Sequence, residues 1–340
     1  MSSYKKVSLG SSVAVLGVLG VGALFVGLFV GPGLGVDKLA ELFAGNGLLA
    51  GIFQLRLGRT LLALLVGAAL GLAGAALQGL TRNPLADPFL TGVSAGAGVG
   101  VAVAALVGIG SATTLGYLGR QGLAFVSGVG AALLVWRLSG GGRFGRNGLI
   151  VAGVVVNATL SGLILVILSW LPIFSQGAVL GWLWGDLSTP YIRWWPMLTA
   201  AVLTVGGGVY LFWRAPALDA LALGEEQAHS LGINLRRGRR GILLAAALLT
   251  ASATALGGII PFVGLVAPHL VRVRAGAGHR RLLPLTALTG AVLVLVADNV
   301  VRLAVNYLSL PSLPLGAALA LLGGPYFFAV YRKMGKKQLL

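Results

Sequence analysis

The sequence predicts an all-α polytopic membrane protein with ten transmembrane helices, a single domain over residues 1–340 and both termini in the cytoplasm. Of the 340 residues, 57% are hydrophobic and 10% are charged, whereas soluble domains average about 25% charged residues. Ten apolar runs follow one another, and most reach the roughly 20 residues that cross a bilayer as a helix. The runs are 9–30, 60–80, 89–108, 120–136, 148–170, 192–213, 241–257, 259–271, 284–304 and 313–331.

The 25 Lys and Arg residues alternate between crowded and sparse gaps, and this alternation predicts the orientation. Short loops rich in Lys and Arg stay in the cytoplasm. With a cytoplasmic N-terminus, nineteen of these residues lie inside and six outside. The six outside are Lys38, Arg56, Arg59, Arg120, Arg193 and Arg302. The net charge of +17 is therefore interpreted as a set of topology determinants and contacts with membrane lipid, and no nucleic-acid partner is expected.

The first run follows Lys5 and Lys6, as the apolar part of a signal peptide would. It is longer than the usual apolar region of about 7–15 residues, and no clear cleavage site follows it, so we expect a retained helix. In the second and third runs glycines recur four positions apart, as at Gly67 and Gly71. That spacing lets helix backbones approach closely.

The runs 241–257 and 259–271 are short, and Pro261 and Pro268 interrupt the second. If 259–271 did not cross, four arginines at 272–281 would lie outside, against the charge rule. We therefore expect a pair of short helices hinged near Gly257, Gly258 and Pro261. Broken helices are tolerated in a membrane where protein buries them or where they line a cavity. This pair is a candidate for the core or the pathway.

The gap at 215–237 is cytoplasmic and too polar to enter lipid. It reads as short amphipathic helices: Leu218, Leu221 and Leu223 can share one apolar side, Gly224 breaks the run, and Glu225 and Glu226 open a second turn. Gly232 closes that turn. A surface linker needs no apolar stripe, so the stripe favours a surface on which another protein docks.

Catalysis and metal binding have little support. The chain has no Cys and three scattered His, which excludes thiol chemistry and gives no pair with metal-ligand spacing. No P-loop occurs, so the chain cannot bind ATP by that motif. We predict no catalytic residue, no metal and no cofactor. Asp298, one turn before Arg302, is expected to pair with it. Few other carboxylates lie in the runs, which argues against an ion-coupled secondary transporter, and an intramembrane enzyme would need clustered polar residues.

Several motifs resemble the integral-membrane permeases of bacterial ABC importers for iron-siderophores, haem and vitamin B12. The strongest stretch is 56–100, with NPLADP at 83–88 as its sharpest motif. The resemblance continues through LGEEQAHSLGI (223–233), GGIIPFVGLVAPHLVR (257–272), HRRLLPLTALTGA (279–291) and LPLGAALALLGGPYFF (313–328). It implies the transmembrane domain of a type II ABC importer, with ten helices in each subunit.

The resemblance also implies partners. Such permeases are homodimers in the bacterial cytoplasmic (inner) membrane, with two separate cytoplasmic ATPase subunits that bind ATP and Mg. The ATPase subunits are expected on the loop between helices 6 and 7. A periplasmic or lipid-anchored binding protein is expected on Arg56, Arg59 and Arg302, and a cytoplasmic gate near Arg146 and Asn147. The residues expected to contact the ATPase are Leu221, Leu223, Gly224, Glu225, Glu226, Leu231 and Gly232.

The sequence thus predicts the permease subunit of an importer for a bulky metal chelate, either an iron-siderophore or haem. Cobalamin is the alternative within the same family, and an ion-coupled secondary transporter is the alternative from a different class.

Overall fold

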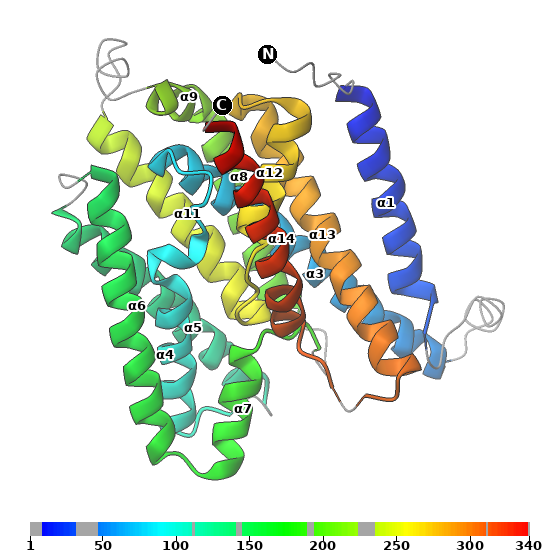
Figure 1. The fold of residues 1–340 in the computed structure, drawn as a ribbon. Helices are drawn as coiled ribbons and strands as arrows, with labels where there is room; N and C mark the ends of the chain where they lie inside the picture. The colour runs from blue at the N-terminus through cyan, green and yellow to red at the C-terminus, as the bar shows by residue number, and fades with distance from the viewer. Residues whose placement is uncertain are drawn as a thin grey trace.

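The computed structural model describes residues 9–31, 47–110, 113–140, 145–188, 194–223, 235–310 and 312–338. These residues form helices and connections without a β-strand (Figure 1). In chain order the helices are α1 (Leu9–Phe29), α3 (Gly47–Thr81), the 3₁₀ turn η2 (Pro88–Thr91), α4 (Val93–Leu106), α5 (Thr114–Leu138), α6 (Gly145–Trp170), α7 (Ile173–Leu183), α8 (Trp194–Trp213), α9 (Ala215–Leu223), α11 (Leu235–Gly257), α12 (Val263–Ala275), α13 (His279–Tyr307) and α14 (Leu315–Gln338).

Each of the ten predicted apolar runs lies on a helix. The two largest differences from the prediction are the start of α3 and an additional helix, α7. Helix α3 begins at Gly47, well before residue 60, so Arg56 and Arg59 lie within it. Helix α7 was not predicted; it fills the gap between Pro172, its N-cap, and Gly185, which has a φ of 73°. Proline before a helix and a left-handed glycine after it are ordinary boundary signals, so the sequence did carry them.

Among the described residues, six helices are long and apolar enough to span a membrane: α3, α5, α6, α8, α11 and α13. Shorter apolar segments lie in α1, α4, α7 and α14. Helix α12 has 13 residues, about 20 Å at 1.5 Å per residue, which is less than the roughly 30 Å hydrocarbon layer. The count of ten spans therefore stays a prediction.

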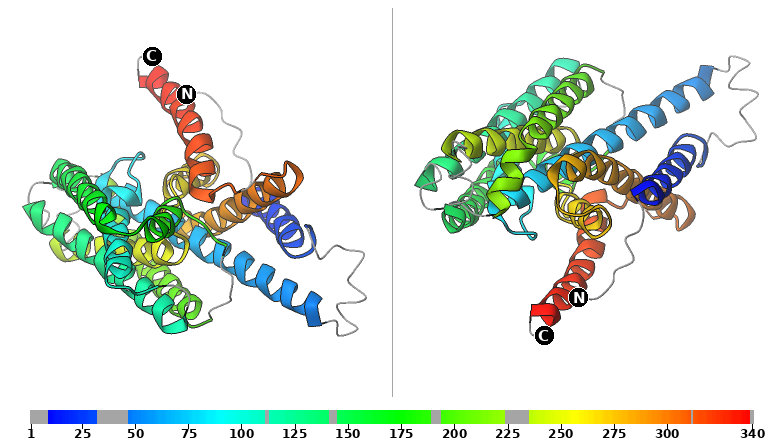
Figure 2. Two further views of the ribbon diagram at one scale, coloured as in Figure 1. Left: turned by 90° about the horizontal axis from the view of Figure 1, so that it is seen from below. Right: turned by 90° about the horizontal axis from the view of Figure 1, so that it is seen from above.

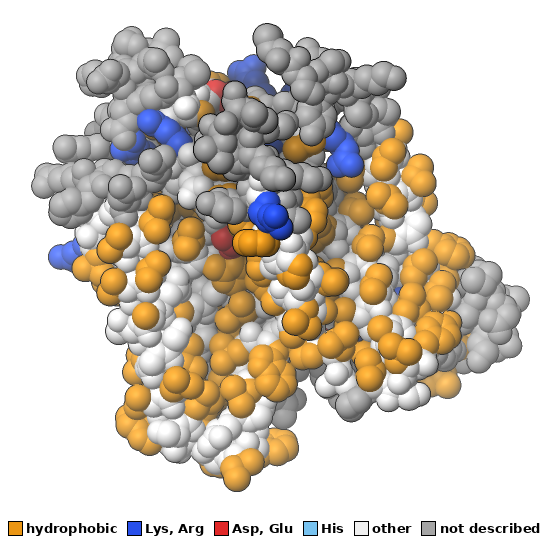
Figure 3. Space-filling model, in the orientation of Figure 1, with side chains coloured by type: hydrophobic (Ala, Val, Ile, Leu, Met, Phe, Trp, Pro, Cys, Tyr) orange, Lys and Arg blue, Asp and Glu red, His pale blue; other side chains and the backbone are white. Residues whose placement is uncertain are grey.

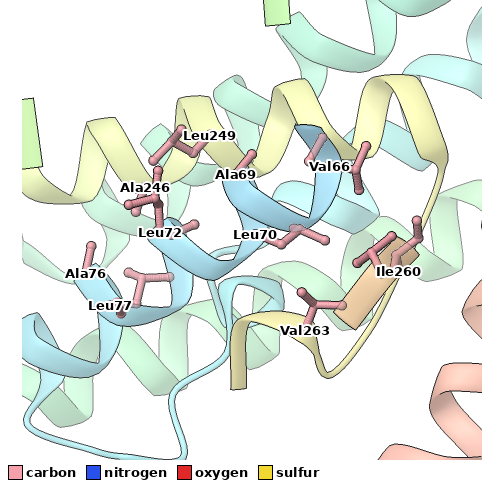
Figure 4. Packing of buried hydrophobic residues seen from close by; sticks show 14 of the residues in the cluster. Val66, Ala69, Leu70, Leu72, Ala76, Leu77, Ala246, Leu249, Ile260 and Val263 are labelled. Carbon is pink, nitrogen blue, oxygen red and sulfur yellow. The ribbon is translucent and has the colours of Figure 1, made fainter. Parts of the chain in front are cut away.

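The middle of helix α3 lies in the core of the bundle. Figure 2 shows α3 running across the bundle, with α1 and α14 at the periphery. From Leu62 to Gly79 almost every residue of α3 is buried, as expected for a helix that is apolar on all sides. Figure 4 shows its side chains Val66, Leu70 and Leu77 packed among residues of α11 and of the α11–α12 connection.

The two ends of the bundle differ in character. Helix α1 begins and α14 ends at the end that carries α9 (Figure 1). Most Lys and Arg side chains visible in Figure 3 lie towards that end, and apolar side chains cover the flank below. Helix α8 has exposed tryptophans at both tips, Trp195 and Trp213, about 27 Å apart along a helix. Tryptophans gather at the two membrane interfaces, so this spacing fits a spanning helix.

The broken pair has the predicted hinge. Helix α11 ends at Gly257 and α12 begins at Val263, with positive φ at Gly258 (69°) and Phe262 (67°). A side chain at Gly258 would overlap the Trp182 carbonyl oxygen. The backbone N–H of Asp186 donates to the Gly257 carbonyl at 3.0 Å. The connection after α7 thus packs directly on the hinge.

Candidate docking sites at the two ends of the bundle

Two of the predicted docking arginines cap helix α1. Arg56 donates from Nη1 to the Leu28 carbonyl at 3.1 Å. Arg302 donates from Nη1 to Gly27 O at 3.0 Å and from Nη2 to Val26 O at 2.9 Å. The last carbonyls of a helix have no partner within the helix and carry partial negative charge, so guanidinium groups suit them. Arg56 is only 8% exposed, so little of it is open to an external partner.

Arg59 is held differently. Its Nε donates to Asp298 Oδ2 at 2.8 Å and its Nη2 to Asp298 Oδ1 at 2.7 Å. Its Nη1 donates to Ser188 Oγ at 2.6 Å. The expectation that Asp298 pairs with Arg302 is therefore wrong, because Arg302 turns to α1 and both Asp298 oxygens go to Arg59. Asp298 has 3% of its side chain exposed and Arg59 has 23%.

The structure brings the three predicted arginines together at the end opposite α9, around the end of α1 and the last turns of α13. Arg59 keeps a partly open side chain together with a strong internal partner. A bidentate Arg–carboxylate pair has fixed geometry. The ion pair therefore holds the Arg59 guanidinium in one position.

Sequence reasoning missed the connection from Arg59 to the hinge. Ser188 lies two positions after Asp186, whose backbone N–H donates to the Gly257 carbonyl of the hinge. In the same connection, the Gly185 carbonyl accepts from the backbone N–H of Gly316, at the start of α14, at 3.2 Å. A side chain at Gly316 would overlap two carbonyl oxygens of this junction. Four segments therefore meet beside Arg59: α3, the connection after α7, the α11–α12 hinge and the start of α14.

At the other end, α9 confirms the first amphipathic turn predicted for 215–237. Its apolar stripe, however, faces the permease itself: Leu218 is 0% and Leu221 1% exposed, both in the main core. Leu221 therefore anchors α9 and does not line an open surface, which corrects its predicted role. The face turned outward holds Pro216 and Ala222, with Asp219 half-buried between them.

Asp219 joins α9 to the start of α13. Its Oδ1 accepts from the backbone N–H of His279 at 3.0 Å and lies 2.6 Å from the ring Nδ1 of His279. The ring is buried, and a side chain added at Gly79 of α3 would meet its Nε2. The sequence alone assigned no role to His279 and did not single out Asp219.

A second polar contact ties α3 to α12 nearby. Arg272 donates from Nη1 to Gln78 Oε1. The amide of Gln78 donates to the Gly264 carbonyl at 3.3 Å and to the Leu265 carbonyl at 3.4 Å. The end of α3 is thus hydrogen-bonded to α12, and its Gly79 packs closely against the His279 ring of α13.

The NPLADP motif forms the connection from α3 to α4. Asn83 Oδ1 accepts from Leu85 N at 3.0 Å, and Asp87 Oδ1 accepts from Phe89 N at 2.9 Å and caps η2. These bonds two residues along the chain are typical of Asn and Asp in turns. Burial raises the pKa of Asp87 to about 6, against a lowering by the Phe89 N–H bond.

Some predicted site residues lie beyond what can be described. Gly224, Glu225, Glu226, Leu231 and Gly232 fall outside the described residues, as does the side chain of Leu223. Arg146 and Asn147 lie in the first turn of α6, but their side chains are outside the described part. The gate and most of the ATPase contacts stay predictions.

A wide apolar groove opens between α3, α8 and α13, with a volume of about 810 Å³. Leu64, Leu198 and Leu288 are among its lining residues. Among the described residues no group of three or more His, Asp or Glu could hold a metal ion. The groove offers apolar contact and no metal ligands.

A helical bundle with long apolar spans, a basic end and an arginine cluster at the opposite end defines a multi-pass membrane protein. The chain belongs to the FecCD transport family, whose profile matches residues 10–333. It is therefore a transport permease of the inner membrane.

The relatives cover most of the chain. It is 37% identical over 274 residues to the hemin transport system permease protein HmuU of Yersinia pestis, which covers 81% of this chain and 80% of that protein. It is 35% identical over 302 residues to the cobalamin import system permease protein BtuC of Halobacterium salinarum, which covers 88% of this chain and 75% of that protein.

A solved structure described as an inward-facing metal-chelate type ABC transporter has the same fold. The TM-score is 0.81 at 30% identity, and the match covers 96% of this chain and 100% of the other.

Proposed function

We propose that the chain is the membrane permease of an ABC importer that carries a bulky iron chelate, a siderophore complex or haem, into the cell. The observation that carries this proposal is the family match over residues 10–333, together with a haem permease as a relative over most of the chain. Cobalamin is the alternative substrate, favoured by the relative from Halobacterium salinarum.

The spans support an importer driven by separate ATPase subunits over an ion-coupled transporter. In the described spanning helices Asp298 is the one acidic residue, and Arg59 pairs with it. Ion and proton relays in membranes use ionisable residues that face the interior of the bundle. A carboxylate held by two bonds to arginine is poorly placed to exchange a proton.

The family match supports the partners proposed for this chain. The permease works as a homodimer with two cytoplasmic ATPase subunits, which bind ATP and Mg. The ATPase contacts α9 and the segment after it, and gating involves the first turn of α6. An external binding protein contacts the cluster formed by Arg56, Arg59 and Arg302, in which the Arg59 side chain is partly open. Arg56 and Arg302 mainly hold the end of α1 in place through its last carbonyl groups.

Uptake by purified protein in liposomes tests this function. The permease is reconstituted with the ATPase subunits and the binding protein that co-purify with it, and uptake of ⁵⁵Fe-haemin, a ⁵⁵Fe-hydroxamate and ⁵⁷Co-cobalamin is compared. We expect uptake of an iron chelate that needs internal ATP, stops with vanadate and survives a proton ionophore. Uptake that ignores vanadate and stops with the ionophore would establish the ion-coupled alternative, and uptake of cobalamin alone would change the substrate.

A further inference from the structure

We propose that α13 links the two docking ends of the permease, with His279 as its attachment to the ATPase end and Asp298 as its attachment to the binding-protein end. The proposal rests on the function proposed above. Both residues are positioning residues, since each acts through a neighbour: His279 through Asp219 and Asp298 through Arg59.

The contact between Asp219 and His279, at the ATPase end, takes the place of a side-chain cap at the start of α13. The N-cap of α13 is Gly278, which has no side chain to bond the first N–H groups. Asp219 of α9 supplies that carboxylate, 3.0 Å from the His279 nitrogen, and also bonds the His279 ring. A negative charge at a helix N-terminus is favourable. Since Leu218 fixes α9 in the core, a displacement of α9 by a docked ATPase would reach α13 through this contact.

The middle of α13 transmits such a displacement because it is packed backbone to backbone. A side chain at Gly67 of α3 would overlap the Gly290 carbonyl oxygen, and one at Gly290 would overlap the Gly67 carbonyl oxygen. Helices α3 and α13 share the most extensive contact between any two described elements. Interiors packed to this density transmit strain and do not absorb it.

The ion pair between Asp298 and Arg59, at the binding-protein end, would pass a displacement of α13 to the three arginines. Asp298 lies nineteen positions after His279, about 28 Å along the helix. A carboxylate from the binding protein on Arg59 would compete with Asp298, and so would weaken the hold of α3 on the end of α13. Such coupling is reciprocal: what one end does to the other, the other does in return.

The experiment uses the assembled complex of permease, ATPase subunits and binding protein in nanodiscs. The variants are His279→Leu, which loses the ring bond to Asp219, His279→Asn, whose amide can still donate to it, and Asp298→Asn. The readout is the ratio of the ATPase rate with saturating binding protein, haemin-loaded or ligand-free, to the basal rate. Arg280→Gln, an exposed neighbour of His279, is the matched control.

We expect His279→Leu and Asp298→Asn each to reduce the stimulation ratio about fivefold or more, in the range of typical couplings between sites. His279→Asn and Arg280→Gln should keep it. His279→Leu should also keep its ATPase stoichiometry, basal rate and thermal stability. Sites this far apart normally act independently, so the decisive result is the double variant: it should lose no more than one single variant does.

Losses that multiply in the double variant, or a normal ratio in His279→Leu, would overturn the proposal. If His279→Leu does not assemble, Asp298→Asn decides alone, and a normal stimulation ratio there overturns it. A wild-type complex that retains no ATPase subunit refutes the proposed function instead.

Discussion

Arg59 and Asp298, 239 positions apart in the chain, form a two-point ion pair at the end of the bundle opposite α9. The pair is asymmetric, because the carboxylate is almost fully buried while the guanidinium is partly open and has Ser188 as a further partner. The asymmetry determines which half of the pair can be changed with little damage.

Arg59→Met should destabilise the permease strongly. It leaves a buried carboxylate without its partner, which costs about 3–5 kcal/mol. Asp298→Asn should cost much less, because Arg59 can still bond to Ser188 and water. The midpoints of thermal and SDS-induced unfolding in detergent measure both. The double variant Arg59→Met with Asp298→Leu should recover most of the loss, and a double variant as unstable as Arg59→Met would contradict the pairing.

The close approach of α3 and α13 leaves no room for a side chain at Gly67. Gly67→Ala would place a methyl group against the Gly290 carbonyl, and overpacking of this kind costs about 1–3 kcal/mol or more. The control is Gly130→Ala in α5, where a methyl group meets no atom within 4 Å. That change should stabilise by about 0.5–1 kcal/mol, because alanine favours the helix. Opposite shifts of the unfolding midpoint are expected, and equal shifts would rule out the backbone contact.

The stability of the permease should depend on the protonation of Asp87. Its pKa is raised from 3.8 to about 6 in the fold, so the folded state holds this proton more tightly than the unfolded chain. The resulting contribution to stability is complete below about pH 4 and is lost as the pH rises through about 6. Asp87→Asn is neutral at every pH and can still cap η2.

The thermal unfolding midpoints of wild type and Asp87→Asn, measured at pH 5 and pH 8, check this. The variant should be the more stable protein at pH 8, and its advantage should shrink at pH 5. A constant difference between the two proteins would mean that Asp87 titrates as it does in the unfolded chain.

The sequence predicted each helix that carries a long apolar run but missed α7, and it did not predict the polar partners between helices. Hydropathy located all ten apolar runs, since each buries or exposes apolar surface over many residues. It placed the start of α3 too late because Gln54, Arg56 and Arg59 interrupt the apolar pattern. The groups that accept hydrogen bonds from the two arginines, Leu28 O and Asp298, lie in other helices. The apolar stripe of α9 was predicted correctly, but the prediction that it forms an open surface was wrong. The spacing of apolar residues shows which side of a helix is apolar and does not show which element packs on that side. The partnership of Asp219 with His279 has no local signal.

The orientation of the bundle can be tested at two exposed positions, Ala277 between α12 and α13 and Ser312 before α14. The chain contains no cysteine, so single cysteines label without background. Ser312→Cys should react with an impermeant maleimide in spheroplasts, because it lies at the end opposite α9. Ala277→Cys should react only after the membrane is opened, since four arginines surround it in the sequence and basic loops stay inside. Labelling of Ala277→Cys in closed spheroplasts would mean that α12 does not cross. The count of spans would then fall to nine, and Arg302 would lie on the cytoplasmic side, where no binding protein could reach it.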